Sequence, residues 1–97
     1  MTSKQRAYLK GLAMNEDTIL HIGKGGVTPE LTENVRLALV ARELVKIGIL
    51  QNCMDDPKEM AQMLAERTKS QIVQIIGKKI VLYKEGQGDD RKIVFPK

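Results

Sequence analysis

Helix-start signals recur three times along this chain, and a short β-prone run follows each of the helical stretches that they open. The signals are Thr2-x-x-Gln5, Thr28-Pro29 and Asp56-Pro57-Lys58-Glu59. A Thr or Asp side chain before a helix accepts a free backbone N–H of the first turn, and proline fits the first helical position because its missing N–H is not needed there. A chain punctuated in this way alternates helices with strands, which favours an α/β architecture.

Hydrophobic periodicity between these signals predicts the individual elements. We expect helices that end near Met14, near Glu43 and at Ser70 or Gln71, and strands over 18–22, 44–50, 72–76 and 80–83. Gly77-Lys78 is typical of a two-residue hairpin turn, so the last two strands should be antiparallel neighbours. The order α-β-α-β-α-β-β predicts one compact α/β domain with a four-stranded mixed sheet packed with helices.

The length of 97 residues leaves room for one hydrophobic core. We expect the folded domain to span residues 1–84 and residues 85–97 to form a polar, mobile tail, because Gly and Asp cluster after Lys84. Residues 93–95, Ile-Val-Phe, could instead add a short edge strand, and the sequence leaves this open.

The residue inventory argues against most enzymatic and metal-binding functions. One His and one Cys cannot supply the three or four spaced ligands of a zinc site, so we expect no metal and no cofactor. Cys53 is interpreted as a small structural thiol rather than a nucleophile, and His21 as a hydrogen-bonded imidazole. We therefore expect no catalytic residues and no enzymatic activity.

The same inventory bears on the compartment. A single cysteine fits a reducing environment, and no run approaches the roughly 18 apolar residues that read as a membrane span. The first residues also lack the apolar stretch of a secretory signal. We expect a monomeric cytoplasmic protein with no membrane partner.

A glycine-rich loop over 23–26, Gly-Lys-Gly-Gly, separates the first strand from the second helix. It lacks the spacing of a Walker loop, and it lacks the third glycine of a dinucleotide fingerprint. A G-x-x-G loop lets the backbone approach a sugar-phosphate closely, the following helix terminus offers free N–H groups, and Lys24 adds a positive charge. The alternative is an ordinary β-α turn that needs small residues.

Charge favours a polyanionic partner. The formal net charge is +4, and residues 67–84 and 1–15 are rich in Lys and Arg and contain no acidic residue. The chain has three aromatic residues, too few for a stacking platform on a sheet. Recognition of backbone and shape is therefore the better hypothesis, with strong salt dependence.

Four stretches together resemble the CRM domain, named for chloroplast RNA splicing and ribosome maturation, and in particular its stand-alone bacterial YhbY-like form. They are residues 9–13 (LKGLA), 21–26 (HIGKGG), 41–47 (ARELVKI) and 75–83 (IIGKKIVLY). The resemblance runs from about Ser3 to Lys84, with Gly48 at a position that is often basic in the family.

This resemblance implies a fold similar to the C-terminal domain of bacterial translation initiation factor 3, RNA binding, and association with precursors of the large ribosomal subunit. The family's G-x-x-G loop carries over to Gly23, Lys24, Gly25 and Gly26. Its basic surface would include Lys4, Arg6, Lys10, Lys46, Lys78 and Lys79.

Our leading hypothesis is a protein that binds structured ribosomal RNA through the G-x-x-G loop and flanking lysines and assists assembly of the large subunit. The alternative is a protein-interaction adaptor that docks on a ribosomal protein or an RNA-processing factor. A small enzyme acting on nucleotides is a third hypothesis, for which the chain lacks general acid-base residues.

Overall fold

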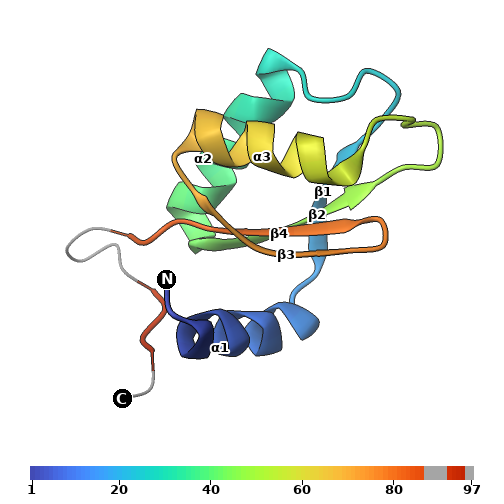
Figure 1. Ribbon diagram of the computed structural model, residues 1–97. Coiled ribbons are helices and arrows are strands. Elements are labelled where there is room, and N and C mark those ends of the chain that lie inside the picture. Colours follow the sequence, from blue (N-terminus) through green and yellow to red (C-terminus); the bar gives the residue numbers. More distant parts are fainter. Residues whose placement is uncertain (87–91, 96–97) are drawn as a thin grey trace.

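The computed structural model of the chain describes residues 1–86 and 92–95 (Figure 1). The helices are α1 (Ser3–Met14), α2 (Pro29–Arg42) and α3 (Pro57–Thr68). The strands are β1 (Thr18–Ile22), β2 (Leu44–Ile49), β3 (Gln71–Ile76) and β4 (Lys79–Tyr83). The predicted α-β-α-β-α-β-β order and α/β class are confirmed, and the boundaries of the elements lie close to those expected.

The helix-start signals act as the sequence predicted. The Thr2 side chain accepts the N–H of Gln5 at 3.1 Å, and the Gln5 side chain accepts the N–H of Thr2 at 3.0 Å, which completes a capping box. Thr28 caps α2 and Asp56 caps α3, each followed by proline at the first helical position. These caps satisfy N–H groups that have no partner inside the helix, so they fix where each helix begins.

The four strands form one mixed sheet in the order β1-β2-β4-β3. β1 and β2 are parallel, and β4 runs antiparallel to both β2 and β3. The predicted hairpin therefore inserts its second strand into the centre of the sheet and leaves β3 at the edge. Residues 80–83 are all buried, as a central strand requires, because it is covered on both faces.

Helices cover the sheet on both faces (Figure 1). On one face, α2 and α3 pack over a core that includes Ile22, Leu39, Ile47, Leu64 and Leu82. On the other face, α1 places Leu9 and Ala13 against a second cluster, formed with Leu44, Val73, Val81 and Tyr83. Strand alternation produces both cores, since successive side chains of β2 and β4 point to opposite faces.

The C-terminal segment extends the second cluster. Residues 92–95 form no strand, and instead Ile93 and Phe95 pack against this cluster. The Phe95 ring lies 5.8 Å from the ring of Tyr8 and 5.8 Å from that of Tyr83, centroid to centroid. The glycine- and aspartate-rich part of the expected tail, residues 87–91, lies outside the described residues.

Glu43 ends α2 and holds this segment in place. It has a φ of +65°, and its side chain is fully buried. Its carboxylate accepts the backbone N–H groups of Gly86 and Ile93, each at 2.7 Å, and that of Lys92. The charge of the buried carboxylate is thus stabilised by hydrogen bonds from a part of the chain more than forty residues away in sequence.

No helix within residues 1–86 and 92–95 combines the length and the apolar character that crossing a membrane requires. Cys53 is buried, and its Sγ lies 3.7 Å from Sδ of Met60 inside the main core. This environment agrees with the structural role expected for the thiol.

Candidate nucleic-acid interface

The glycine-rich loop forms a tight turn at the end of β1. The N–H of Gly26 donates to the carbonyl of Gly23 at 3.0 Å, which closes the turn and places Lys24 and Gly25 at its tip. Lys24 and Gly25 are exposed, whereas Gly26 is buried. The part of the loop that a ligand can contact is therefore the Lys24-Gly25 peptide group and the backbone groups on either side of it.

The three glycines of the loop play different structural roles. Gly26 has a φ of +68°, and a Cβ atom added there would lie 2.5 Å from Oδ2 of Asp55. A Cβ at Gly23 or Gly25 would make ordinary contacts, at 3.7 Å to Leu50 Cδ1 and 3.5 Å to Thr28 Cγ2. The backbone conformation thus favours glycine at 26, and the other two positions leave the exposed backbone free for close approach.

The N-terminus of α2 offers less to an anion than the sequence suggested. Pro29 has no N–H, and the hydroxyl of Thr28 accepts the N–H of Leu31 at 3.0 Å. Glu30 adds a negative charge to the first turn. Because the first-turn donors are largely absent or satisfied, the turn tip is the better candidate for phosphate contact than the helix terminus.

The β3–β4 turn brings Lys78 to the same end of the sheet. Leu50, just beyond β2, donates its N–H to the carbonyl of Ile22 at 2.9 Å, and Ile49 donates to the carbonyl of Lys78 at 2.7 Å. One strand therefore separates the glycine-rich turn from the hairpin turn. Since neighbouring strands are about 4.8 Å apart, the two turns lie about 10 Å apart, and both carry an exposed lysine.

Lys46 and Lys79 lie on the sheet face that α1 covers in part. The Nζ of Lys46 donates to the carbonyl of Ala13 at 3.3 Å, at the end of α1, and the Nζ of Lys79 donates to Oγ1 of Thr18 at 3.1 Å. Lys79 reaches Thr18 across Gly48, where a Cβ would lie 3.3 Å from its Nζ. These two lysines are half-buried, and their amino groups donate hydrogen bonds inside the fold. They therefore add positive charge to this surface, but their amino groups are already engaged.

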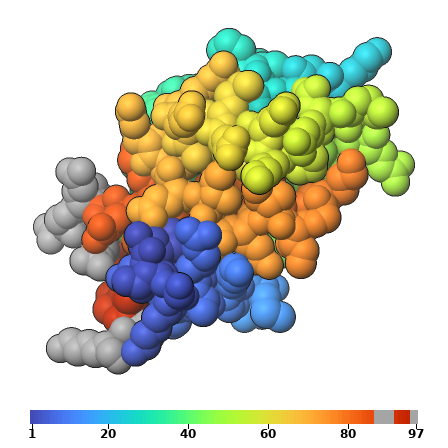
Figure 2. All heavy atoms as spheres, viewed as in Figure 1, coloured from blue at the N-terminus to red at the C-terminus, as the bar shows by residue number. Residues whose placement is uncertain are grey.

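The basic residues of α1 lie apart from the glycine-rich turn. Lys4, Arg6 and Lys10 are exposed on α1, and the N-terminus of this helix lies at the opposite end of the sheet from the β3–β4 turn (Figure 1). Figure 2 shows α1 below β3 and β4 and α3 above them. The structure thus brings together residues 23–26, Lys78 and Lys79, and it places the α1 residues on a different part of the surface.

Acidic residues beside the turn are the part of this region that sequence reasoning missed. Asp55 and Glu59 line a pocket of about 270 Å³ together with Gly25, Val27 and Met63. The loop after β2 must lie next to the loop after β1 because the two strands are parallel neighbours. The Asp55-Asp56 pair before Pro57 could therefore have been placed beside the glycine-rich turn once this pairing was known. The carboxylate of Asp55 would repel an anion from the side of the turn that it faces.

Within the described part of the chain, no group of three or more His, Cys, Asp or Glu side chains is arranged to hold a metal ion. His21 is exposed on β1 opposite Gly48, close to the glycine-rich turn. The arrangement can bind an anionic backbone through exposed lysines and peptide groups, and it presents no nucleophile beside a general base.

Known proteins are similar to this chain along its length. Residues 1–84 match the CRS1 / YhbY (CRM) domain family. The chain is 41% identical over 96 residues to the Bacillus subtilis protein named "Probable RNA-binding protein YqeI", covering 99% of both chains. It is 28% identical over 97 residues to a Haemophilus influenzae protein named "RNA-binding protein", covering 100% of this chain and 96% of the relative. The solution structure of the hypothetical protein SAV1595 from Staphylococcus aureus has a TM-score of 0.82 and 44% identity, covering 99% of both chains.

Proposed function

Because the chain belongs to the CRS1/YhbY (CRM) domain family, we propose that it is an RNA-binding protein that contacts the RNA backbone through the glycine-rich turn and the neighbouring hairpin turn. Relatives along its whole length carry names that describe RNA binding. A binding role, without chemistry, also fits the site, which presents lysines and peptide groups.

The observation that carries this proposal is the pairing of two exposed lysines at one end of the sheet. Lys24 lies at the tip of a turn whose glycines let a ligand approach the backbone. Lys78 lies in the β3–β4 turn at the same end of the sheet, with the end of β2 between the two turns. Two turns about 10 Å apart, each with an exposed lysine, suit two nearby phosphates of a folded RNA.

We further propose that the RNA is ribosomal RNA of large-subunit precursors, bound in the cytoplasm by a monomer. The basic residues of α1 and the pair Lys46 and Lys79 would extend the contact along the domain. Phosphate contacts carry affinity and little sequence information, so structure in the RNA, more than its sequence, would select the site.

Sedimentation of tagged protein in bacterial lysate tests the proposal. The double variant Lys24→Glu/Lys78→Glu reverses both turn lysines, and Lys69→Glu is a matched control, because Lys69 is an exposed residue that follows the far end of α3. We expect wild type and the control to sediment with large-subunit precursors at low salt, and the double variant to remain at the top of the gradient.

Circular dichroism shows whether the double variant is folded, and ribonuclease treatment shows whether sedimentation depends on RNA. If the folded double variant sediments like wild type, the turns do not bind the RNA. If wild-type protein stays with the particles after ribonuclease and at high salt, a ribosomal protein is the partner, because screening weakens phosphate contacts much more than an apolar protein interface.

A further inference from the structure

The edge strand β3 presents an unusual surface. Within the described residues it pairs with β4 on one side, and its other side has no neighbouring strand. Its sequence, QIVQII, contains no charged residue and no proline, which are the usual means of protecting a sheet edge from further pairing. One register irregularity, between Ile72 and Gln74, is the protective feature that it carries.

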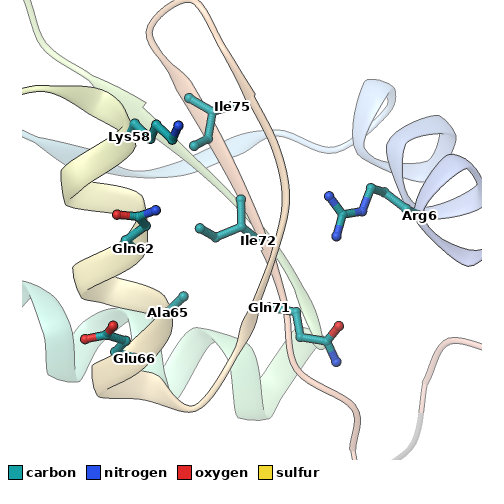
Figure 3. A pocket seen from close by; sticks show the side chains of 8 residues that line it. All are labelled: Arg6, Lys58, Gln62, Ala65, Glu66, Gln71, Ile72 and Ile75. Carbon is teal, nitrogen blue, oxygen red and sulfur yellow. The ribbon is translucent and has the colours of Figure 1, made fainter. Parts of the chain in front are cut away.

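A cleft of about 670 Å³ runs along this edge (Figure 3). Successive turns of α3 form one wall, with Lys58, Gln62 and Glu66 at i, i+4 and i+8, and Arg6 of α1 faces the cleft from the opposite side (Figure 3). Ile72 and Ile75 of β3 form its floor and pack on the main core beneath. Figure 2 shows the same strand exposed between the two helices.

The polar groups of the cleft are available to a partner. Lys58, Arg6 and Gln62 have exposed side chains, and within residues 1–86 and 92–95 these side chains form no hydrogen bond or ion pair. Lys58 therefore lies at the end of the cleft nearer the β3–β4 turn, and Arg6 faces the middle of the cleft (Figure 3). Glu66 lies at the other end.

We propose that this cleft binds an extended, acidic peptide segment of a protein partner, which adds to the sheet as a strand beside β3. Strand addition is the way in which an open sheet edge recognises peptides: main-chain hydrogen bonds provide affinity, and alternate side chains provide selectivity. Here the peptide side chains that face α3 would contact Ile72 and Ile75 and place an acidic residue beside Lys58, and the alternate side chains, which face α1, would place an acidic residue beside Arg6.

The observations favour a peptide over RNA at this cleft. Its floor is aliphatic, none of its lining residues is aromatic, and Glu66 would repel a phosphate chain. A backbone edge with hydrophobic side chains and uncharged amides matches another β-strand instead. The cleft also lies away from the glycine-rich turn, so a protein and an RNA could bind together.

Selection from a phage-displayed library of random 12-residue linear peptides tests the proposal with a defined probe. We expect enriched peptides to combine apolar residues with acidic ones that face both helices, and to bind the Lys58→Glu and Arg6→Glu variants at least about fivefold more weakly than wild type. Lys69→Glu is the matched control and should bind like wild type. Replacing the acidic residue beside Lys58 by a basic one in the best peptide should restore its affinity for the Lys58→Glu variant.

Backbone NMR of the labelled full-length chain identifies the mode. Addition of the best synthetic peptide should shift the amide signals of residues 71–76 and slow their hydrogen exchange, and leave those of Lys24 and Gly25 unchanged. The proposal is wrong if no selected peptide depends on Lys58 or Arg6, or if the shifts fall outside β3.

Two other outcomes would assign the cleft to a different occupant and overturn the proposal. If the protein alone dimerises, and the β3 signals shift with its concentration, a second copy occupies the edge. If a structured RNA shifts the β3 signals and the Lys58→Glu variant loses that RNA, the cleft belongs to the nucleic-acid surface. The Lys24→Glu/Lys78→Glu variant tests the two proposals separately. We expect it to lose RNA binding and to keep peptide binding.

Discussion

A Cβ atom on Gly26 would lie 2.5 Å from Oδ2 of Asp55, so the Asp55 carboxylate, at the end of an exposed side chain in the loop after β2, would have to move aside for any other residue. The left-handed φ of +68° adds a cost of about 1–2 kcal/mol for any other residue. We therefore expect Gly26→Ala to lower the free energy of unfolding by about 1–2 kcal/mol in urea denaturation. Gly25→Ala is the control and should change it by less than about 0.5 kcal/mol, because its Cβ would make an ordinary contact with Thr28. Equal stabilities of the two variants would contradict this account of the turn.

Salt dependence should report the role of Lys24. Each phosphate neutralised by a lysine contributes about 0.7–0.9 to the slope of log affinity against log salt concentration. We expect Lys24→Ala to reduce this slope by about that amount for a folded ribosomal RNA fragment, measured by fluorescence anisotropy between low and moderate salt. Lys69→Ala should leave the slope unchanged. A weaker affinity with an unchanged slope would mean that Lys24 acts by shaping the turn, and not by contacting phosphate.

The elements of the fold could be predicted from the sequence because their boundaries are set locally. Thr2 with Gln5, Thr28 with Pro29, and Asp56 with Pro57 determine helix starts within a few residues, and the structure confirms each cap. The order of strands in the sheet depends on contacts distant in sequence. The continuous apolar run at 80–83 was the available indication that β4, and not β3, is central.

The candidate site was predictable in part for the same reason. The glycine-rich turn and the hairpin turn are local features, and strand pairing brings them to one end of the sheet. Asp55 was missed because its proximity to Gly26 follows from the parallel pairing of β1 and β2. The separation of Arg6 from the turn also depends on tertiary structure, because the position of α1 on the sheet is set by packing of Leu9 and Ala13.

Acid titration should show the Glu33–Arg36 ion pair on the surface of α2. The hydrogen bond from the Arg36 guanidinium, together with its charge, lowers the pKa of Glu33 from its ordinary value of 4.5. A lowered pKa means that the pair contributes stability above the unfolded-state pKa and loses it as the pH falls through the folded-state value. We expect the Glu33 carboxyl carbon, followed by NMR, to titrate below 4.5, and Arg36→Gln to raise its midpoint. Arg42→Gln should not change it; a similar rise in both variants would indicate a general charge effect.

The buried carboxylate of Glu43 should control whether residues 92–95 stay on the domain. It accepts backbone N–H groups from Gly86, Lys92 and Ile93, and hydrogen bonds to a charged group each contribute about 1.5–3 kcal/mol. We expect Glu43→Gln to lower the free energy of unfolding by about 2 kcal/mol, and to speed hydrogen exchange at Ile93 by at least about tenfold. Glu66→Gln changes an exposed carboxylate and should have neither effect.

Glu43→Gly separates the carboxylate from the backbone conformation. Glycine adopts the φ of +65° without the cost that a side chain incurs, so this change alone would stabilise the end of α2 by about 1 kcal/mol. Because the carboxylate is lost at the same time, we expect a net loss of stability and rapid exchange at Ile93, with the packing of Phe95 on Tyr8 weakened. If Glu43→Gly were more stable than wild type and kept Ile93 protected, apolar packing of Ile93 and Phe95, and not the carboxylate, would hold the C-terminal segment.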